Sequence, residues 1–153
     1  MRIAHIAPLV ESVPPKMYGG TERVVSWLVD ELVRQGHDLT LFATADSKTT
    51  ATLVPCAETG LRLAGINDHT GYLLAMLEQV WVRASEFDIL HFHTDLLQFP
   101  LFRRFADKCV TTLHGRLDLP DLLPAFKTFP HMPLVSISYA QRKELGEIGR
   151  AHV

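Results

Sequence analysis

The sequence predicts an α/β fold with a doubly wound, Rossmann-like parallel sheet, and three observations support this class. Short apolar runs alternate along the chain with longer segments of helical periodicity. The runs are four to six residues long and apolar on both faces, as expected of strands that helices cover on both sides. Their order, strand then helix, is that of right-handed βαβ units, which build parallel sheets.

The expected elements follow one another along the whole chain. The expected strands are residues 2–7, 39–43, 51–54, 88–92, 109–113 and 134–137. The expected helices are 21–35, 70–85, 96–106 with an interruption near Pro100, a weakly periodic 119–128, and 139–146. In the first helix, an apolar stripe of Val25, Leu28, Val29 and Leu32 lies opposite Arg23, Ser26, Asp30 and Arg34. Gly36 follows where a helix favours a left-handed residue.

Composition sets limits on the kind of protein. A chain of 153 residues suits one domain, and 47% hydrophobic with 21% charged residues is ordinary for a globular one. The net charge of −2 does not indicate a nucleic-acid or anionic membrane partner. The chain has neither a signal-peptide cleavage pattern nor the ~18 apolar residues of a membrane span. Cys56 and Cys109 form no CxxC pair, which indicates reduced, buried thiols. We therefore expect a cytoplasmic protein.

Ligands of doubly wound sheets bind beyond the carboxyl ends of the strands, and a long loop follows the first strand. Residues 8–20 open into the first helix with Gly19 and Gly20, and Glu22 lies in its first turn. Glycines and free amides at a helix start admit a phosphate. Alternatively, the pair only makes a turn while Glu22 complements the helix dipole. The GxGxxG fingerprint is absent, which counts against a dinucleotide-dependent oxidoreductase.

Histidines end the fourth and fifth expected strands. His91 and His93 share one face of their strand, with Asp95 just beyond. His114 and Arg116 follow the next strand. Histidines on one face can bind zinc, but no third ligand is arranged locally, so no metal is expected. The pattern favours a polar ligand site.

The remaining polar and aromatic residues have simpler interpretations. Ser136 and Ser138 end the sixth strand, and Ser138 is interpreted first as the N-cap of the next helix. His5 is expected in the core. Three further histidines fall in expected turns, namely His37, His69 and His131. Trp27 and Trp81 lie within helical patterns and are interpreted as packing residues.

Five segments together resemble family-4 glycosyltransferases, which are retaining enzymes of the GT-B fold. They are MRIAHIAP, YGGTERVVSWLVDELVRQGHDLTLFA, FDILHFHTD, VTTLHGRLDLP and PLVSISYAQR. The resemblance runs from Met1 to about Leu145. It implies an N-terminal, acceptor-side domain of a protein that transfers a sugar from a nucleotide-sugar donor to a small-molecule, glycan or lipid-linked acceptor.

The resemblance also implies roles for individual residues. The catalytic residue beside the transferred sugar would be His114, and the donor diphosphate would face Gly19 and Gly20. The candidates for substrate binding are Glu22, His93, Asp95, Arg116 and Ser138. The nucleotide sugar is a co-substrate, so no cofactor is expected. The leaving phosphate assists deprotonation of the acceptor, so no protein nucleophile is required.

The chain departs from the family pattern in one respect. The second domain, which binds the donor through paired glutamates and a basic residue, does not follow. We therefore expect residues 1–147 to be an incomplete domain without activity of its own. Residues 148–153 are expected to be a non-native tail, because they can be encoded by a nucleotide string that matches a sequencing-library adapter. The alternative is a stand-alone flavodoxin-like or nucleotide-binding Rossmann domain.

Overall fold

The computed structural model describes residues 1–145, in which six strands form a sheet in the order β3-β2-β1-β4-β5-β6. The strands are β1 Arg2–Ile6, β2 Asp38–Thr44, β3 Thr52–Ala57, β4 Ile89–Phe92, β5 Cys109–Leu113 and β6 Leu134–Ser136. β2 pairs in parallel with β1 and β3, and β5 pairs in parallel with β6. The predicted doubly wound α/β class is confirmed. The expected tail, residues 148–153, lies outside the described residues.

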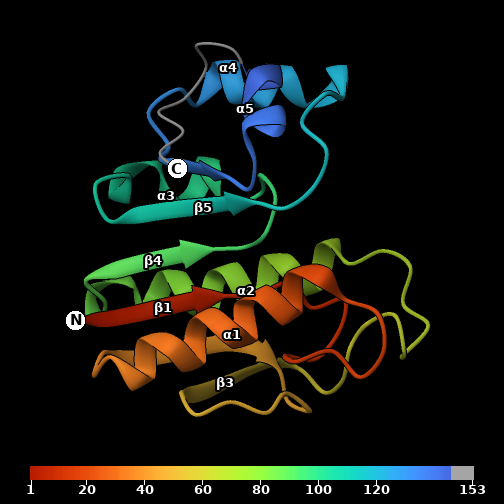
Figure 1. Ribbon diagram of the computed structural model, residues 1–153, viewed down its shortest axis with the longest axis vertical. Helices are drawn as coiled ribbons and strands as arrows, with labels where there is room; N and C mark the ends of the chain where they lie inside the picture. The colour runs from red at the N-terminus through yellow and green to blue at the C-terminus, as the bar shows by residue number, and fades with distance from the viewer. Residues whose placement is uncertain (146–153) are drawn as a thin grey trace. The chain divides into compact units, whose positions relative to one another are not determined.

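The helices connect these strands in the predicted alternation (Figure 1). They are α1 Gly20–Arg34, α2 Thr70–Val82, α3 Phe99–Phe102, α4 Leu123–Thr128 and α5 Tyr139–Leu145. Three 3-10 turns are η1 Ala84–Glu86, η2 Arg103–Phe105 and η3 Pro120–Leu122. The chain divides into two compact units, residues 1–90 and the residues from His91 onward.

In the first unit, strand β2 is packed on both of its faces. Leu41 and Ala43 lie in one buried cluster with Val25 and Val29 of α1. The next side chain along β2, Phe42, instead makes an edge contact with the ring of Phe87, at a centroid distance of 6.1 Å. Because neighbouring strand residues face opposite sides, β2 is covered on both, as its apolar sequence predicts.

Helix α1 differs from its predicted pattern at two positions. Ser26, expected on the polar side, is buried at 8% exposure, because it lies beside Val25 on the face turned to the core. Trp27, interpreted as a packing residue, is instead 65% exposed. The end of the helix agrees with the prediction, since Gly36 has a φ of 86° and its N–H donates to Val33 O at 2.9 Å.

The second unit is packed by phenylalanines. The ring of Phe92 lies 4.9 Å from that of Phe102, and Phe99 contacts the rings of Phe126 and Phe129 at 6.5 and 5.9 Å. These side chains join the end of β4 to α3 and to the segment of α4.

Several predicted boundaries are wrong. The helix expected at 96–106 is reduced to α3 and η2, and Pro100 lies in the first turn of α3 rather than interrupting a longer helix. Proline is tolerated there because the first N–H groups of a helix have no partner within it. The helix expected at 70–85 ends at Val82. β3 extends to Ala57, beyond the expected 51–54.

Two further expectations concern the cysteines and membrane spans. Cys56 and Cys109 are free thiols, half-buried and buried respectively, and burial raises the pKa of each to about 12. Within residues 1–145, no helix has the length and apolar character needed to cross a membrane.

Candidate functional site

The loop between β1 and α1 is bound to the rest of the first unit by its backbone. Leu9 O accepts a hydrogen bond from Leu61 N at 2.9 Å, and Val13 N donates to Ser47 Oγ at 2.9 Å. Gly60 permits the close approach, because a Cβ there would lie 2.9 Å from the Cα of Glu11. These contacts therefore fix the position of the loop that precedes Gly19.

The two glycines at the start of α1 have different surroundings. A Cβ on Gly19 would lie 2.8 Å from both Glu22 Oε2 and Pro15 Cβ, so the packing of the protein itself accounts for this glycine. A Cβ on Gly20 would meet nothing within 4 Å. Gly20 is thus the position at which a ligand has room to approach the backbone, whereas the space beside Gly19 is filled by Glu22 and Pro15.

Glu22 is buried, and its carboxyl interacts with the charges of Glu11 and Arg62. Burial raises the pKa of its carboxyl, and the charge of Glu11 raises it further, while N–H groups of the backbone and the charge of Arg62 oppose the shift. Glu11 Oε1 forms an ion pair with Arg62 Nη1 at 3.0 Å, and its side chain is 3% exposed. Arg62 also donates to Tyr18 O at 3.2 Å, so it fixes the residue before Gly19.

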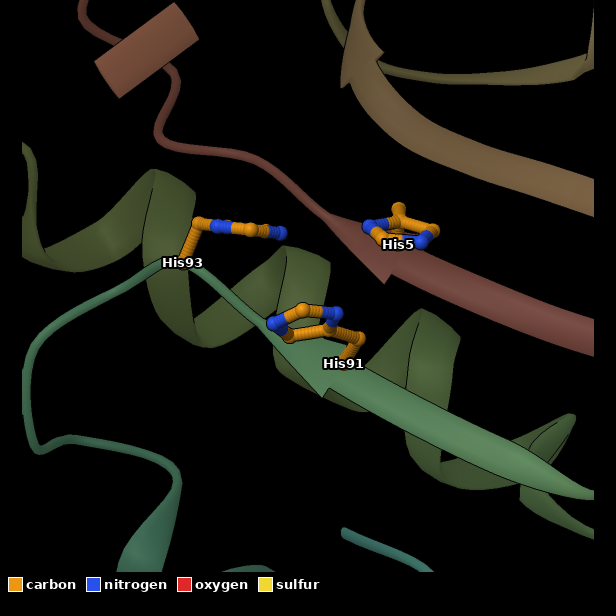
Figure 2. Close-up of side chains that lie close together, drawn as sticks. All are labelled: His5, His91 and His93. Atoms are coloured by element: carbon orange, nitrogen blue, oxygen red, sulfur yellow. The ribbon is translucent and has the colours of Figure 1, made fainter. Parts of the chain in front are cut away.

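In the second unit, His91 and His93 project together at the carboxyl end of β4, as Figure 2 shows. Their rings are stacked, with centroids 4.2 Å apart and planes inclined by 27°. A hydrogen bond of 2.8 Å links His91 Nε2 to Thr112 Oγ1 on β5. Burial, with a smaller contribution from His114, lowers the pKa of His91 to about 4. His91 is therefore a neutral imidazole at pH 7.

His93 contacts the next predicted site residue directly. Its Nδ1 lies 3.0 Å from His114 Nε2, at hydrogen-bond distance. Burial lowers the pKa of His114, and the charge of Asp95 opposes this shift. Gln98, which sequence analysis missed, fixes the segment after His93 by donating to Thr94 O and Asp95 O, each at 3.2 Å.

An open pocket of about 540 Å³ lies beside His114. It combines three of the predicted residues with an apolar part, and its lining is His114, Gly115, Arg116, Leu117, Asp118, Ile137, Ser138, Ala140 and Gln141. The guanidinium of Arg116 binds the carboxylate of Asp118 through two hydrogen bonds, one of them 2.8 Å long between Nε and Oδ1. The charge of Arg116 is thereby compensated, so the pocket suits a hydroxylated ligand better than a strong anion.

Ser138 has the predicted capping role. Its Oγ accepts a hydrogen bond from Gln141 N at 3.1 Å, at the start of α5. Gln141 itself was missed by sequence analysis, although its spacing from Ser138 matches a capping box, S-x-x-Q. This signal would have placed Gln141 at the helix start without indicating its contacts to β5.

The structure therefore gathers the predicted site residues in two groups. Gly19, Gly20 and Glu22 lie together in the first unit. The second unit brings together His93, Asp95, His114, Arg116 and Ser138. The stacked imidazoles of His91 and His93 are chemically suited to a metal ion, and His93 already shares a hydrogen bond with His114. That no metal or cofactor is bound stays a prediction.

Comparison with known proteins gives one family and one fold. Residues 18–148 match the family model described as Glycosyltransferase Family 4. Among solved structures, the chain is similar to AviGT4, a glycosyltransferase involved in avilamycin A biosynthesis, with a TM-score of 0.55 and 21% identity. The similarity covers 95% of this chain and 39% of that one, so the chain spans about two fifths of the length of the structure it matches. Comparison with curated proteins gives no match.

Proposed function

The chain belongs to glycosyltransferase family 4, and from this premise we propose that it forms the acceptor-side wall of an enzyme that transfers a sugar from a nucleotide-sugar donor to an acceptor, with retention of configuration. The observation that carries the proposal is the second-unit group, in which His93, His114, Arg116 and Ser138 converge at the carboxyl ends of neighbouring strands. In doubly wound sheets this is the edge where ligands bind.

The donor diphosphate is assigned to the start of α1. N–H groups at a helix N-terminus attract phosphate, and a ligand has room beside Gly20, where a Cβ would meet nothing within 4 Å. The neighbouring Glu22 would repel a phosphate if it were fully ionised. Burial raises the pKa of the Glu22 carboxyl, which favours its neutral form and so acts against that repulsion.

The transferred sugar is assigned to His114 and the acceptor to the pocket beside it. A neutral imidazole can donate to or accept from a sugar hydroxyl. The side chains of Arg116 and Ser138 offer further polar contacts along the pocket, and Leu117 and Ile137 offer apolar surface for a sugar ring. In the proposed reaction the leaving phosphate takes the proton of the acceptor, so the residues of this chain position the two substrates and stabilise charge.

Binding of nucleotide to the chain itself tests the donor assignment. Amide NMR spectra would be recorded with UDP and GDP, and with uridine and guanosine as controls that lack phosphate. We expect the diphosphates to shift the amides of Gly20 and Thr21, and Gly20→Ala to weaken this binding. The matched control is Gly71→Ala, because Gly71 also lies in the first turn of a helix with nothing within 4 Å of a new Cβ. Absence of shifts at Gly20, or an equal effect of both variants, would contradict the assignment.

We propose further that the 153 residues alone do not catalyse transfer. A transition state requires donor and acceptor held together in near-attack geometry, and the chain spans only 39% of the transferase structure that it matches. The measurement is transfer of radiolabelled sugar from UDP- and GDP-sugars to simple glycosides by the purified chain. Turnover above the rate without protein would refute this part of the proposal.

A further inference from the structure

Gln141 of α5 makes three hydrogen bonds around the predicted catalytic residue. Its Nε2 donates to Leu113 O at 2.9 Å and to Gly115 O at 2.7 Å, which are the carbonyls on either side of His114. Its Oε1 accepts from Ile137 N at 2.7 Å. The side chain therefore joins the end of β5 to the turn between β6 and α5, and both of its N–H groups and its oxygen are used.

Capping of α5 explains only part of this arrangement. In a capping box, the third helical residue accepts a hydrogen bond near the helix start through its side-chain oxygen. Here the side-chain oxygen of Gln141 accepts from Ile137 N, one residue before the N-cap Ser138, and Ser138 Oγ accepts from Gln141 N. The two bonds donated to Leu113 and Gly115 contribute nothing to the cap. A glutamate would cap as well, but it has no N–H groups to donate.

The segment that carries His114 has few other fixed points. Gly115 and Arg116 are exposed, and the side chain of Arg116 bonds to Asp118, which belongs to the same turn. The ring of His114 is bonded to His93 on one side. On the other side, the bonds from Gln141 fix the backbone from which this ring projects.

We propose that Gln141 is a positioning residue for His114, because its amide fixes both flanking carbonyls and so keeps the imidazole in register with His93 and the pocket. The functional meaning rests on the proposed role of His114 beside the transferred sugar. The structural relationship is measurable on the chain itself, without substrate or turnover. Failure of the glycosyltransferase proposal and failure of this one are therefore distinguishable.

Three variants separate positioning from capping. Gln141→Met preserves the length of the side chain and removes all three hydrogen bonds. Gln141→Glu keeps an acceptor for Ile137 N but loses both donated bonds. Ser138→Ala removes the side-chain cap of α5 and leaves the donated bonds in place, so it is the matched control for a loss of helix stability.

The measurements are long-range ¹⁵N–¹H NMR spectra of the histidine rings and the ¹³C shifts of the Leu113 and Gly115 carbonyls that accept the Gln141 bonds, recorded well below each variant's Tm. We expect both Gln141 variants to change the ring signals of His114 and to shift both carbonyl signals, since the two bonds donated by Gln141 are lost, while Ser138→Ala leaves the ring and carbonyl signals unchanged. The proposal is overturned if the Gln141 variants keep the wild-type ring signals. It is also overturned if Ser138→Ala changes them equally. If Gln141→Met does not fold, Gln141→Glu decides alone.

Discussion

His93 Nδ1 and His114 Nε2 lie 3.0 Å apart, so one imidazole donates the shared proton and the other accepts it. Such a bond couples the tautomers of the two rings, because a neutral imidazole has one donor and one acceptor nitrogen, so the choice of donor in one ring decides the acceptor in the other. The group that His114 offers to a ligand is therefore set by His93, which lies on the neighbouring strand end.

Replacement of His93 tests this relationship. His93→Phe keeps a ring beside His91 and removes the bond to His114. We expect the His114 ring to sample both tautomers and the protein to lose about 1–2 kcal/mol of unfolding free energy. Ring ¹⁵N shifts and urea unfolding measure the two effects. Unchanged His114 ring shifts in the folded variant would show that the bond does not fix the tautomer.

His91 makes stability depend on pH. Its pKa falls from an ordinary 6.5 to about 4 in the folded protein, so between these values the unfolded chain binds the proton and the folded chain does not. The stabilisation is complete above pH 6.5 and is lost as the pH falls towards 4. From pH 7 to pH 5, we expect the free energy of unfolding to fall by about 2 kcal/mol on this account.

The corresponding experiment compares urea unfolding at pH 7, 6 and 5. His91→Gln should flatten the dependence, whereas His131→Gln, the same change at an exposed position of the same unit, should leave it steep. His114 has a lowered pKa as well and adds to the same slope. An equally steep dependence in His91→Gln would contradict the assignment to His91.

The strand ends of the second unit could be predicted from sequence, because alternation along a strand and the rule of parallel sheets together bring His93 and His114 to one edge. The partners of Glu22 could not. Arg62 follows β3 by several residues and reaches Glu11 only through backbone pairing of two irregular loops, for which no periodicity exists. Gln141 lies between these cases, since its capping spacing is visible in the sequence while its bonds to β5 depend on tertiary packing.

The two glycines at the start of α1 should respond differently to the same substitution. Gly19→Ala introduces a Cβ 2.8 Å from the ring of Pro15, and we expect it to cost about 1–3 kcal/mol of unfolding free energy. Gly20→Ala enters open space in a helical position, and stability should be unchanged or higher by up to about 1 kcal/mol. Thermal unfolding of both variants checks this order. Equal losses would mean that Gly20 also has a packing role.

Glu22 provides a test of the opposite sign of pH dependence. Its folded pKa is raised by burial above the ordinary 4.5, so its contribution to stability is complete below pH 4.5 and is lost as the pH rises through the folded value. Glu22→Gln keeps an oxygen that can accept from the backbone and removes the buried charge. We therefore expect the variant to be more stable than the wild type at pH 7, and equal to it near pH 4. Glu58→Gln, at an exposed position of the same unit, should change neither value. If Glu22→Gln is the less stable protein at pH 7, attraction of the carboxylate to the backbone N–H groups outweighs its desolvation, and Glu22 would then compete with a phosphate at the start of α1.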